Sequence, residues 1–187
     1  MKQTMSTVLK VLLLIIMMIV LMSGVVKKMN ENNMLSKFET EINKGNFDKM
    51  SLTIYYMNPS SLTLYPLSAE DLINMSSEDG IYEDGVTKIN VKASALYENK
   101  ELLKLINNNV LIPVDSKSRM NTRIYYVFKD QNGQKLFDVA MWGVTDSIYV
   151  NGREYEENDV FYEVILPFLP GFAVEELRYY LKLKNQN

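Results

Sequence analysis

The chain of 187 residues contains no cysteine and no histidine. It therefore forms no disulfide, carries no thiol nucleophile, and builds neither a Cys/His zinc site nor a Ser-His-Asp triad from its own residues. The glycine-rich patterns of nucleotide-binding loops, the S-x-x-K pair and the H-E-x-x-H motif are also missing. These absences exclude many classes of enzyme, and we expect no catalytic residues, no cofactor and no metal ion.

Acidic residues are absent before Glu31, so the chain divides by charge. From residue 29 onward it has 16 basic and 23 acidic residues, which gives a net charge of −7. An acidic domain argues against binding to nucleic acid and against adhesion to anionic lipid, because both ligands are themselves negative. Hydrophobic residues make up 47% of the chain, which excludes wholesale disorder.

The longest apolar run, VLLLIIMMIVLMSGVV at residues 11–26, lies between lysines. We predict a transmembrane helix from Val8 to Val26, in contact with membrane lipid, because about 20 helical residues cross a hydrocarbon core of about 30 Å. The alternative is a cleaved signal peptide, but Met22 is bulky where a cleavage site needs a small residue. A buried core helix does not fit, because the run is apolar on every side.

Orientation and domain boundaries follow from this segment. Lysines on both sides nearly balance the positive-inside rule, and the position at the extreme N-terminus favours an N-terminus inside the cell. We therefore predict a single-pass cell-membrane protein with an extracytoplasmic C-terminal domain, or a secreted domain if the segment is cleaved. The expected parts are an anchor at 1–28, a polar juxtamembrane stalk or short helix at 29–50, and one α+β domain at 51–187.

Hydrophobic periodicity and turn residues indicate the order of the elements. Alternating and β-branched stretches predict strands at Ser51–Met57, Leu62–Tyr65, Val86–Ala93, Arg123–Lys129, Gln134–Trp142, Ser147–Val150 and Arg153–Tyr155. Helical spacing, with a capping box from Ser68 to Asp71, predicts helices at about 36–43, 68–75, 94–107 and 172–184. Asn-Gly pairs at 132–133 and 151–152 predict type I′ hairpin turns. We expect an antiparallel sheet covered by helices on one face.

Aromatic side chains on the predicted strands are the best candidates for a binding surface. Alternation places Tyr125 on one face of its strand and Tyr126 and Phe128 on the other, and Trp142 ends the next strand. An exposed patch of these aromatics would suit a protein or glycan partner. The competing interpretation is core packing beneath a helix, which is the commoner fate of aromatics on strands.

Acidic side chains allow two further hypotheses. The runs at 78–84 and 154–159 offer oxygen ligands for calcium but lack the spacing of an EF-hand, so we expect solvated loops. Two carboxylates within one cleft would allow glycoside hydrolysis, provided that one of them had a raised pKa.

A resemblance is carried by RIYYVFKDQNGQKLFDVAMWG and SIYVNGREYEE, through the D-x-x-G turn at Asp130–Gly133 and the V-N-G-R-x-Y motif at Val150–Tyr155. These stretches resemble uncharacterised small membrane-anchored or lipoprotein-like extracytoplasmic domain proteins of Gram-positive bacteria, although the lipoprotein cysteine is missing here. The resemblance implies no catalytic residues. We expect a non-enzymatic binding or envelope-interaction module; the alternatives are an accessory subunit of a membrane complex or a secreted carboxylate-dependent hydrolase.

Overall fold

The computed structural model describes residues 17–18, 35–76, 85–91, 93–98, 100–106, 111–115, 119–141 and 147–184. The chain divides into two compact units, Met1–Met34 and Leu35–Asn187. Apart from Met17 and Met18, the predicted transmembrane segment Val8 to Val26 lies outside the described residues. Within the residues that are described, no helix combines the length and the apolarity that crossing a membrane requires.

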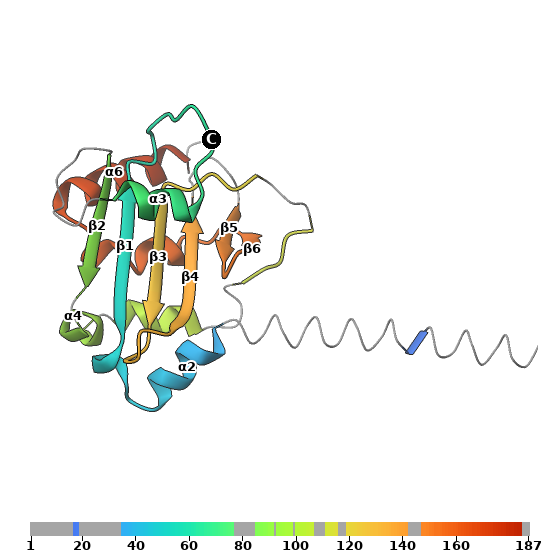
Figure 1. Ribbon diagram of the computed structural model, residues 1–187, viewed down its shortest axis with the longest axis vertical. Coiled ribbons are helices and arrows are strands. Elements are labelled where there is room, and N and C mark those ends of the chain that lie inside the picture. The colour runs from blue at the N-terminus through green and yellow to red at the C-terminus, as the bar shows by residue number, and fades with distance from the viewer. Residues whose placement is uncertain are drawn as a thin grey trace, which may run out of the picture. The chain divides into compact units, whose positions relative to one another are not determined.

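The second unit is built on one antiparallel sheet (Figure 1). In the described part of the chain, six strands lie in the order β2-β1-β3-β4-β5-β6, and every neighbouring pair is antiparallel. The strands are β1 Ser51–Met57, β2 Val86–Val91, β3 Ile124–Lys129, β4 Lys135–Met141, β5 Ser147–Val150 and β6 Arg153–Glu156. The predicted α+β class with an antiparallel sheet is confirmed.

Helices and 3-10 segments connect the strands. They are α2 Ser36–Asn43, η1 Phe47–Lys49, α3 Ala69–Met75, α4 Ala93–Glu98, η2 Lys100–Ile106, α5 Val160–Glu163, η3 Leu166–Phe168 and α6 Gly171–Lys184. The sequence prediction placed α2, α3 and α6 within a residue of their observed ends. It missed α5, η1 and η3, because each is about one turn long and too short to show a period.

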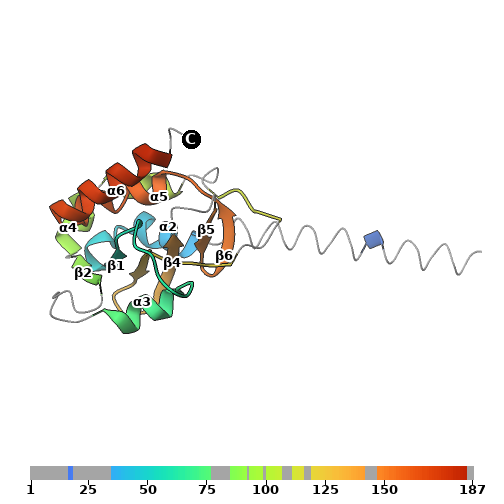
Figure 2. The same cartoon turned by 90° about the horizontal axis from the view of Figure 1, so that it is seen from above.

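Both faces of the sheet are apolar, because side chains of alternate residues point to opposite sides of a strand. On one face, Tyr56 of β1 donates its hydroxyl to Ala173 O at 3.3 Å, and Tyr126 of β3 donates to Phe161 O at 3.2 Å. These bonds fasten α6 and α5 over this face (Figure 2). Most of the largest buried side chains belong to this layer, which is the main core.

Helix α3 lies on the opposite face, so the prediction that the helices share one face was wrong (Figure 2). Its Leu72 is fully buried against a second apolar cluster that includes Tyr55, Tyr125 and Val127. The physical reason is that β1 and β3 carry large apolar residues at odd as well as even positions. Each face therefore needs a cover to exclude water.

Helix α2 packs against the sheet and belongs to the second unit. Its Phe38 has no exposed surface, and its ring centroid lies 5.0 Å from that of Phe128 and 4.9 Å from that of Phe137. The sequence left a stalk and a short helix open for residues 29–50, and the helix is what forms at 36–43. The compact unit thus starts at Leu35, upstream of the domain start predicted at Ser51.

The predicted return strand at Leu62–Tyr65 does not form; these residues lie in a loop between β1 and α3. A return strand would have to pair with β1. Both edges of β1 are already occupied, by β2 on one side and by β3 on the other. No hydrogen-bonding edge of β1 remains for a third partner, so the segment stays outside the sheet.

The two Asn-Gly hairpins differ. Asn151 and Gly152 have φ angles of 50° and 75°, which confirms the predicted type I′ turn. In the β3–β4 hairpin only Gly133 has a positive φ, of 76°, and Asn132 does not. That loop is longer, because Asp130 N–H donates to Gln134 O and the register shifts at Lys129. The prediction of a type I′ turn at Asn132–Gly133 was therefore wrong.

The single helix predicted at 94–107 is divided into α4 and the 3-10 segment η2. In a 3-10 helix residues i and i+3 lie above one another. Leu102 and Leu105 are spaced in this way, and both are fully buried, whereas Leu103 is 47% exposed. The tighter winding thus buries Leu102 and Leu105. It turns Leu103 toward solvent, although the sequence placed Leu103 on the same apolar face.

Candidate functional site

The loop from Asn58 to Leu67, here called the apolar loop, carries large apolar side chains into solvent. Leu62 is 98% exposed, Leu64 94% and Tyr65 75%. The loop crosses the end of the sheet at which β1 stops, the upper end in Figure 1. A single exposed apolar residue is ordinary, but three within four residues form a patch that folding does not use. Such a patch is a candidate surface for interaction.

A buried arginine holds the middle of the apolar loop in place. Arg123 is only 2% exposed, and its Nε donates to Ser61 O at 3.0 Å while Nη2 donates to Thr63 Oγ1 at 2.9 Å. Nη1 donates to Asn121 Oδ1 at 2.7 Å and to Thr122 O at 3.0 Å. Burial lowers the pKa of the Arg123 guanidinium, but a guanidinium stays charged in a protein. The planar guanidinium, with its several donors, thus holds the middle of the apolar loop against the residues that precede β3.

Both ends of the apolar loop are also fastened. At its start, Ser60 N–H donates to Asn58 Oδ1 at 2.8 Å, which is a typical asparagine-led turn. At its end, Leu67 N–H donates to Asn121 Oδ1 at 3.0 Å, and Leu67 O accepts from Thr122 N–H at 2.7 Å. The backbone is therefore ordered while the apolar side chains project, and an ordered loop loses little entropy on binding.

The capping box predicted from Ser68 to Asp71 is confirmed, and it joins the apolar loop to α3. Ser68 Oγ accepts from Asp71 N–H at 3.1 Å, and the Asp71 carboxylate accepts from Ser68 N–H at 2.7 Å. Hydrogen bonds from the backbone and the hydroxyl of Ser68 lower the pKa of Asp71 below its usual value of 3.8. The helix start thus fixes where the loop ends.

Replacing Ser68 by alanine is expected to lower the free energy of unfolding by about 0.5–2 kcal/mol, because the cap is lost.

Because the folded-state pKa of Asp71 lies below the unfolded value of 3.8, its charge stabilises the fold above about pH 4, and this contribution is lost as the pH falls through the folded-state pKa. Asp71→Asn should therefore destabilise more at pH 7 than toward pH 2. Urea denaturation at both pH values measures this, with the exposed Asp115→Asn as control. An Asp71→Asn effect independent of pH would contradict it.

Three of the four aromatics predicted as partner-binding residues lie in the core. Tyr126 and Phe128 have no exposed surface and Tyr125 is 8% exposed, while Trp142 lies outside the described residues. Tyr125 donates its hydroxyl to Asp138 Oδ2 at 3.2 Å, and burial raises its pKa. Core packing was the competing interpretation for these residues. Because three of the four are covered by α3, α5 and α2, we do not propose them as a binding surface.

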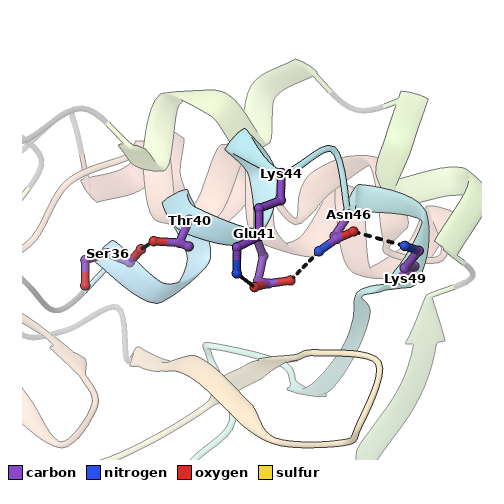
Figure 3. Close-up of polar contacts among 6 residues, drawn as sticks. All are labelled: Ser36, Thr40, Glu41, Lys44, Asn46 and Lys49. Carbon is purple, nitrogen blue, oxygen red and sulfur yellow. Dashed lines mark hydrogen bonds and ion pairs between the residues drawn. The ribbon is translucent and has the colours of Figure 1, made fainter.

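A shallow open cleft of about 280 Å³ lies between α2 and the β3–β4 hairpin. Figure 3 shows polar groups along α2 and η1 that bond to one another: Glu41 accepts from Lys44 Nζ at 3.0 Å and from Asn46 Nδ2 at 2.7 Å. The side chains that line the cleft are mostly charged or polar: Ser36, Lys37, Thr40, Glu41, Lys44, Asp130, Gln134, Lys135 and Leu136. The bonds of Glu41 are thus made within its own segment.

Two carboxylates, Glu41 and Asp130, line this cleft, so it bears on the hydrolase alternative. Hydrogen bonds from Asn46 and Lys44 lower the pKa of Glu41, whereas a general acid needs a raised one. Asp130 Oδ1 accepts from the backbone N–H groups of Asn132 and Gln134, each at 2.8 Å, and so fastens the hairpin turn. This arrangement stabilises local structure and does not favour acid catalysis.

The structure describes only one of the two acidic runs that were considered as calcium ligands. Residues 78–84 lie outside the described residues. In the second run, Glu154 accepts from Ser147 Oγ at 2.8 Å, and Glu157 accepts from the Tyr162 hydroxyl at 2.5 Å. Among the side chains that the structure describes, no three acids gather as a metal site would need.

The sequence reasoning did not single out the apolar loop. A usable signal was present, because residues 50–69 carry no charge and Leu62, Leu64 and Tyr65 stand between two prolines. That signal was assigned to a strand.

Comparisons of the chain with protein-family models, with curated proteins and with solved structures gave no match.

Proposed function

We propose that this chain is a single-pass membrane protein whose C-terminal unit is a non-enzymatic binding module in the cell envelope. It contacts its partner through the apolar loop. The observation that carries the proposal is the exposure of Leu62, Leu64 and Tyr65 on a backbone that Arg123 holds in place.

Burial of the exposed apolar side chains of this loop would contribute favourable free energy to a contact. Fully burying a leucine side chain contributes about 1.5–3 kcal/mol, so Leu62 and Leu64 together contribute on the order of 3–6 kcal/mol. Tyr65 adds an aromatic ring with a polar tip, a residue type enriched at binding hot spots. Because the loop is already ordered, little of this energy is spent on ordering it.

The membrane part of the proposal is supported by the sequence. Residues 11–26 contain no charge, and lysines stand on both sides. A helix of Val8 to Val26 covers a hydrocarbon core of about 30 Å, with Lys10 extending its long stem toward the headgroups. The C-terminal unit then lies outside the cytoplasm, or is secreted if the segment is cleaved.

Washing membranes with alkaline carbonate is expected to leave the full-length protein in the pellet, because an apolar helix stays in the bilayer when peripheral proteins are stripped. A variant lacking residues 1–28 serves as the control and should appear in the supernatant. Release of the intact chain, or recovery of soluble protein without residues 1–24, would contradict the anchor.

Replacing Leu62 and Leu64 together by serine is expected to abolish partner contact and to leave stability nearly unchanged, because both side chains are almost fully exposed. Crosslinking in native membranes, followed by purification of the full-length protein, measures the contact. Leu103→Ser, at a residue that is 47% exposed on η2, is the matched control. Equal crosslinking of the double variant and the control would contradict the role of the loop.

An accessory subunit of a membrane complex is a related possibility, in which the anchor helix makes the contact. Ser23 and Gly24 provide the small residues for close helix packing. A pull-down in mild detergent, with and without residues 1–28, separates the two: loop-dependent contacts survive removal of the anchor and helix-dependent contacts do not.

A further inference from the structure

We infer that the apolar loop binds a protein surface in which an apolar pocket is bordered by basic side chains, and that it does not insert into the lipid bilayer. This inference rests on the proposed function, since it names the partner of the same loop. Three features of the described residues lead to it: the position of the loop, the charge beside it and the shape of the patch.

The apolar loop and α2 lie at opposite ends of the sheet (Figure 1). At one end of β1, Ser51 pairs with Lys129 beside the β3–β4 hairpin, where Phe38 of α2 contacts Phe128. At the other end Met57 pairs with Val86, and the apolar loop begins one residue later. Seven residues of strand separate these ends by about 20 Å. The apolar loop therefore lies at the end of the sheet that α2 does not cover.

Charge next to the loop favours a basic partner and disfavours anionic lipid. No charged residue occurs from Met50 to Ala69, so the loop itself offers nothing to phosphate headgroups. Glu70 and Asp71 follow at once and are exposed at the start of α3. Loops that insert into anionic bilayers depend on adjacent lysine and arginine, whereas these carboxylates are repelled by the negative surface potential. Basic side chains on a protein partner would instead be complementary to them.

The shape of the patch suits a pocket. Leu62 and Leu64 alternate with Thr63, whose hydroxyl is occupied by Arg123 and Tyr65 O, so the two leucines project from a backbone that is bonded beneath them. Side chains that project in this way fill a preformed cavity and exclude water from it, which is how hot-spot residues act at protein interfaces.

The test uses the absence of cysteine from the chain, because Leu64→Cys then provides a single thiol. A benzophenone crosslinker on this thiol is activated in native membranes that contain the full-length protein, and the crosslinked peptide is mapped by mass spectrometry. Tyr179→Cys, at an aromatic residue that is 63% exposed on α6, provides the matched control site. In a second arm, an environment-sensitive fluorophore replaces the crosslinker, and the protein is reconstituted in vesicles of phosphatidylcholine with or without phosphatidylglycerol.

We expect position 64, and not position 179, to crosslink to one protein, within a peptide that contains apolar residues flanked by lysine or arginine. The yield should fall at least about tenfold when Leu62→Ser is added, because one buried leucine accounts for that ratio. It should also fall as salt is raised, because screening weakens the charged rim. Fluorescence from position 64 should match that from position 179 in both kinds of vesicle.

A blue shift confined to position 64 in vesicles would overturn the inference in favour of the bilayer, while leaving the loop as a contact surface. A mapped peptide without basic residues would overturn the charged rim and with it the inference. Equal crosslinking from positions 64 and 179 would contradict the claim that the apolar loop contacts a partner, and therefore the proposed function as well. Release of the protein by carbonate bears only on the anchor.

Discussion

Replacing Arg123 by methionine is expected to lower the free energy of unfolding by about 3–5 kcal/mol, because hydrogen bonds from a charged group contribute about 1.5–3 kcal/mol each and some of their acceptors are re-solvated. The guanidinium is 2% exposed and bonds to Ser61, Thr63 and Asn121. Methionine keeps most of the volume but donates no hydrogen bond. Thermal or urea denaturation, followed by circular dichroism, measures the loss.

The same variant should loosen the apolar loop before it unfolds the sheet. Amide hydrogen exchange at Ser61 and Leu67 should become faster, while exchange in β3 changes less, because the strand keeps its ladder bonds on both sides. Arg119→Met, at an exposed residue, is the control and should change neither quantity. If the two arginine variants were equally stable, Arg123 would not be the residue that holds the loop.

Replacing Phe38 by alanine is expected to cost about 3–5 kcal/mol, the range for large aromatic residues in a packed core. Phe38 has no exposed surface and lies against the stacked pair Phe128 and Phe137, whose ring centroids are 4.8 Å apart. Removing it leaves a cavity beneath α2 and detaches the segment through which the chain enters the unit. Urea denaturation of the full-length protein in detergent measures the cost.

Phe172→Ala is the matched control for this prediction, because it removes the same side chain at a residue on α6 that is 40% exposed. It should cost clearly less than Phe38→Ala. A Phe38→Ala protein as stable as the control would mean that α2 does not belong to the core, and that residues 29–50 behave as the stalk that the sequence also allowed.

Elements defined by neighbouring residues were predicted well. β1 and β5 have the predicted ends, α2 begins and ends where the spacing of Leu35, Phe38 and Ile42 placed it, and the Ser68–Asp71 box forms as expected. In each case the signal lies within one or two turns of helix, or within one strand and its turn. Local propensity and long-range packing agree at these positions.

The candidate site was not predicted, because it depends on contacts between distant residues. Thr63 and Ser61 are bonded by an arginine 60 and 62 residues further along the chain, and no local pattern reveals that pairing. The alternation Leu62–Thr63–Leu64 is as typical of a strand as of an exposed loop. Likewise, the aromatics on β3 gave no indication of which face would be covered.

The sequence by itself determined the periods of β1, β5, α2 and α6, the turn at Asn151–Gly152, the start of α3, and the contrast between an apolar N-terminal run and an acidic remainder. The tertiary structure decided which strands became neighbours. Because β2 and β3 occupy both edges of β1, residues Leu62–Tyr65 were left without a hydrogen-bonding partner and turned outward. Side-chain periodicity arises from backbone geometry within a few residues, whereas strand pairing is a competition among segments far apart in the chain.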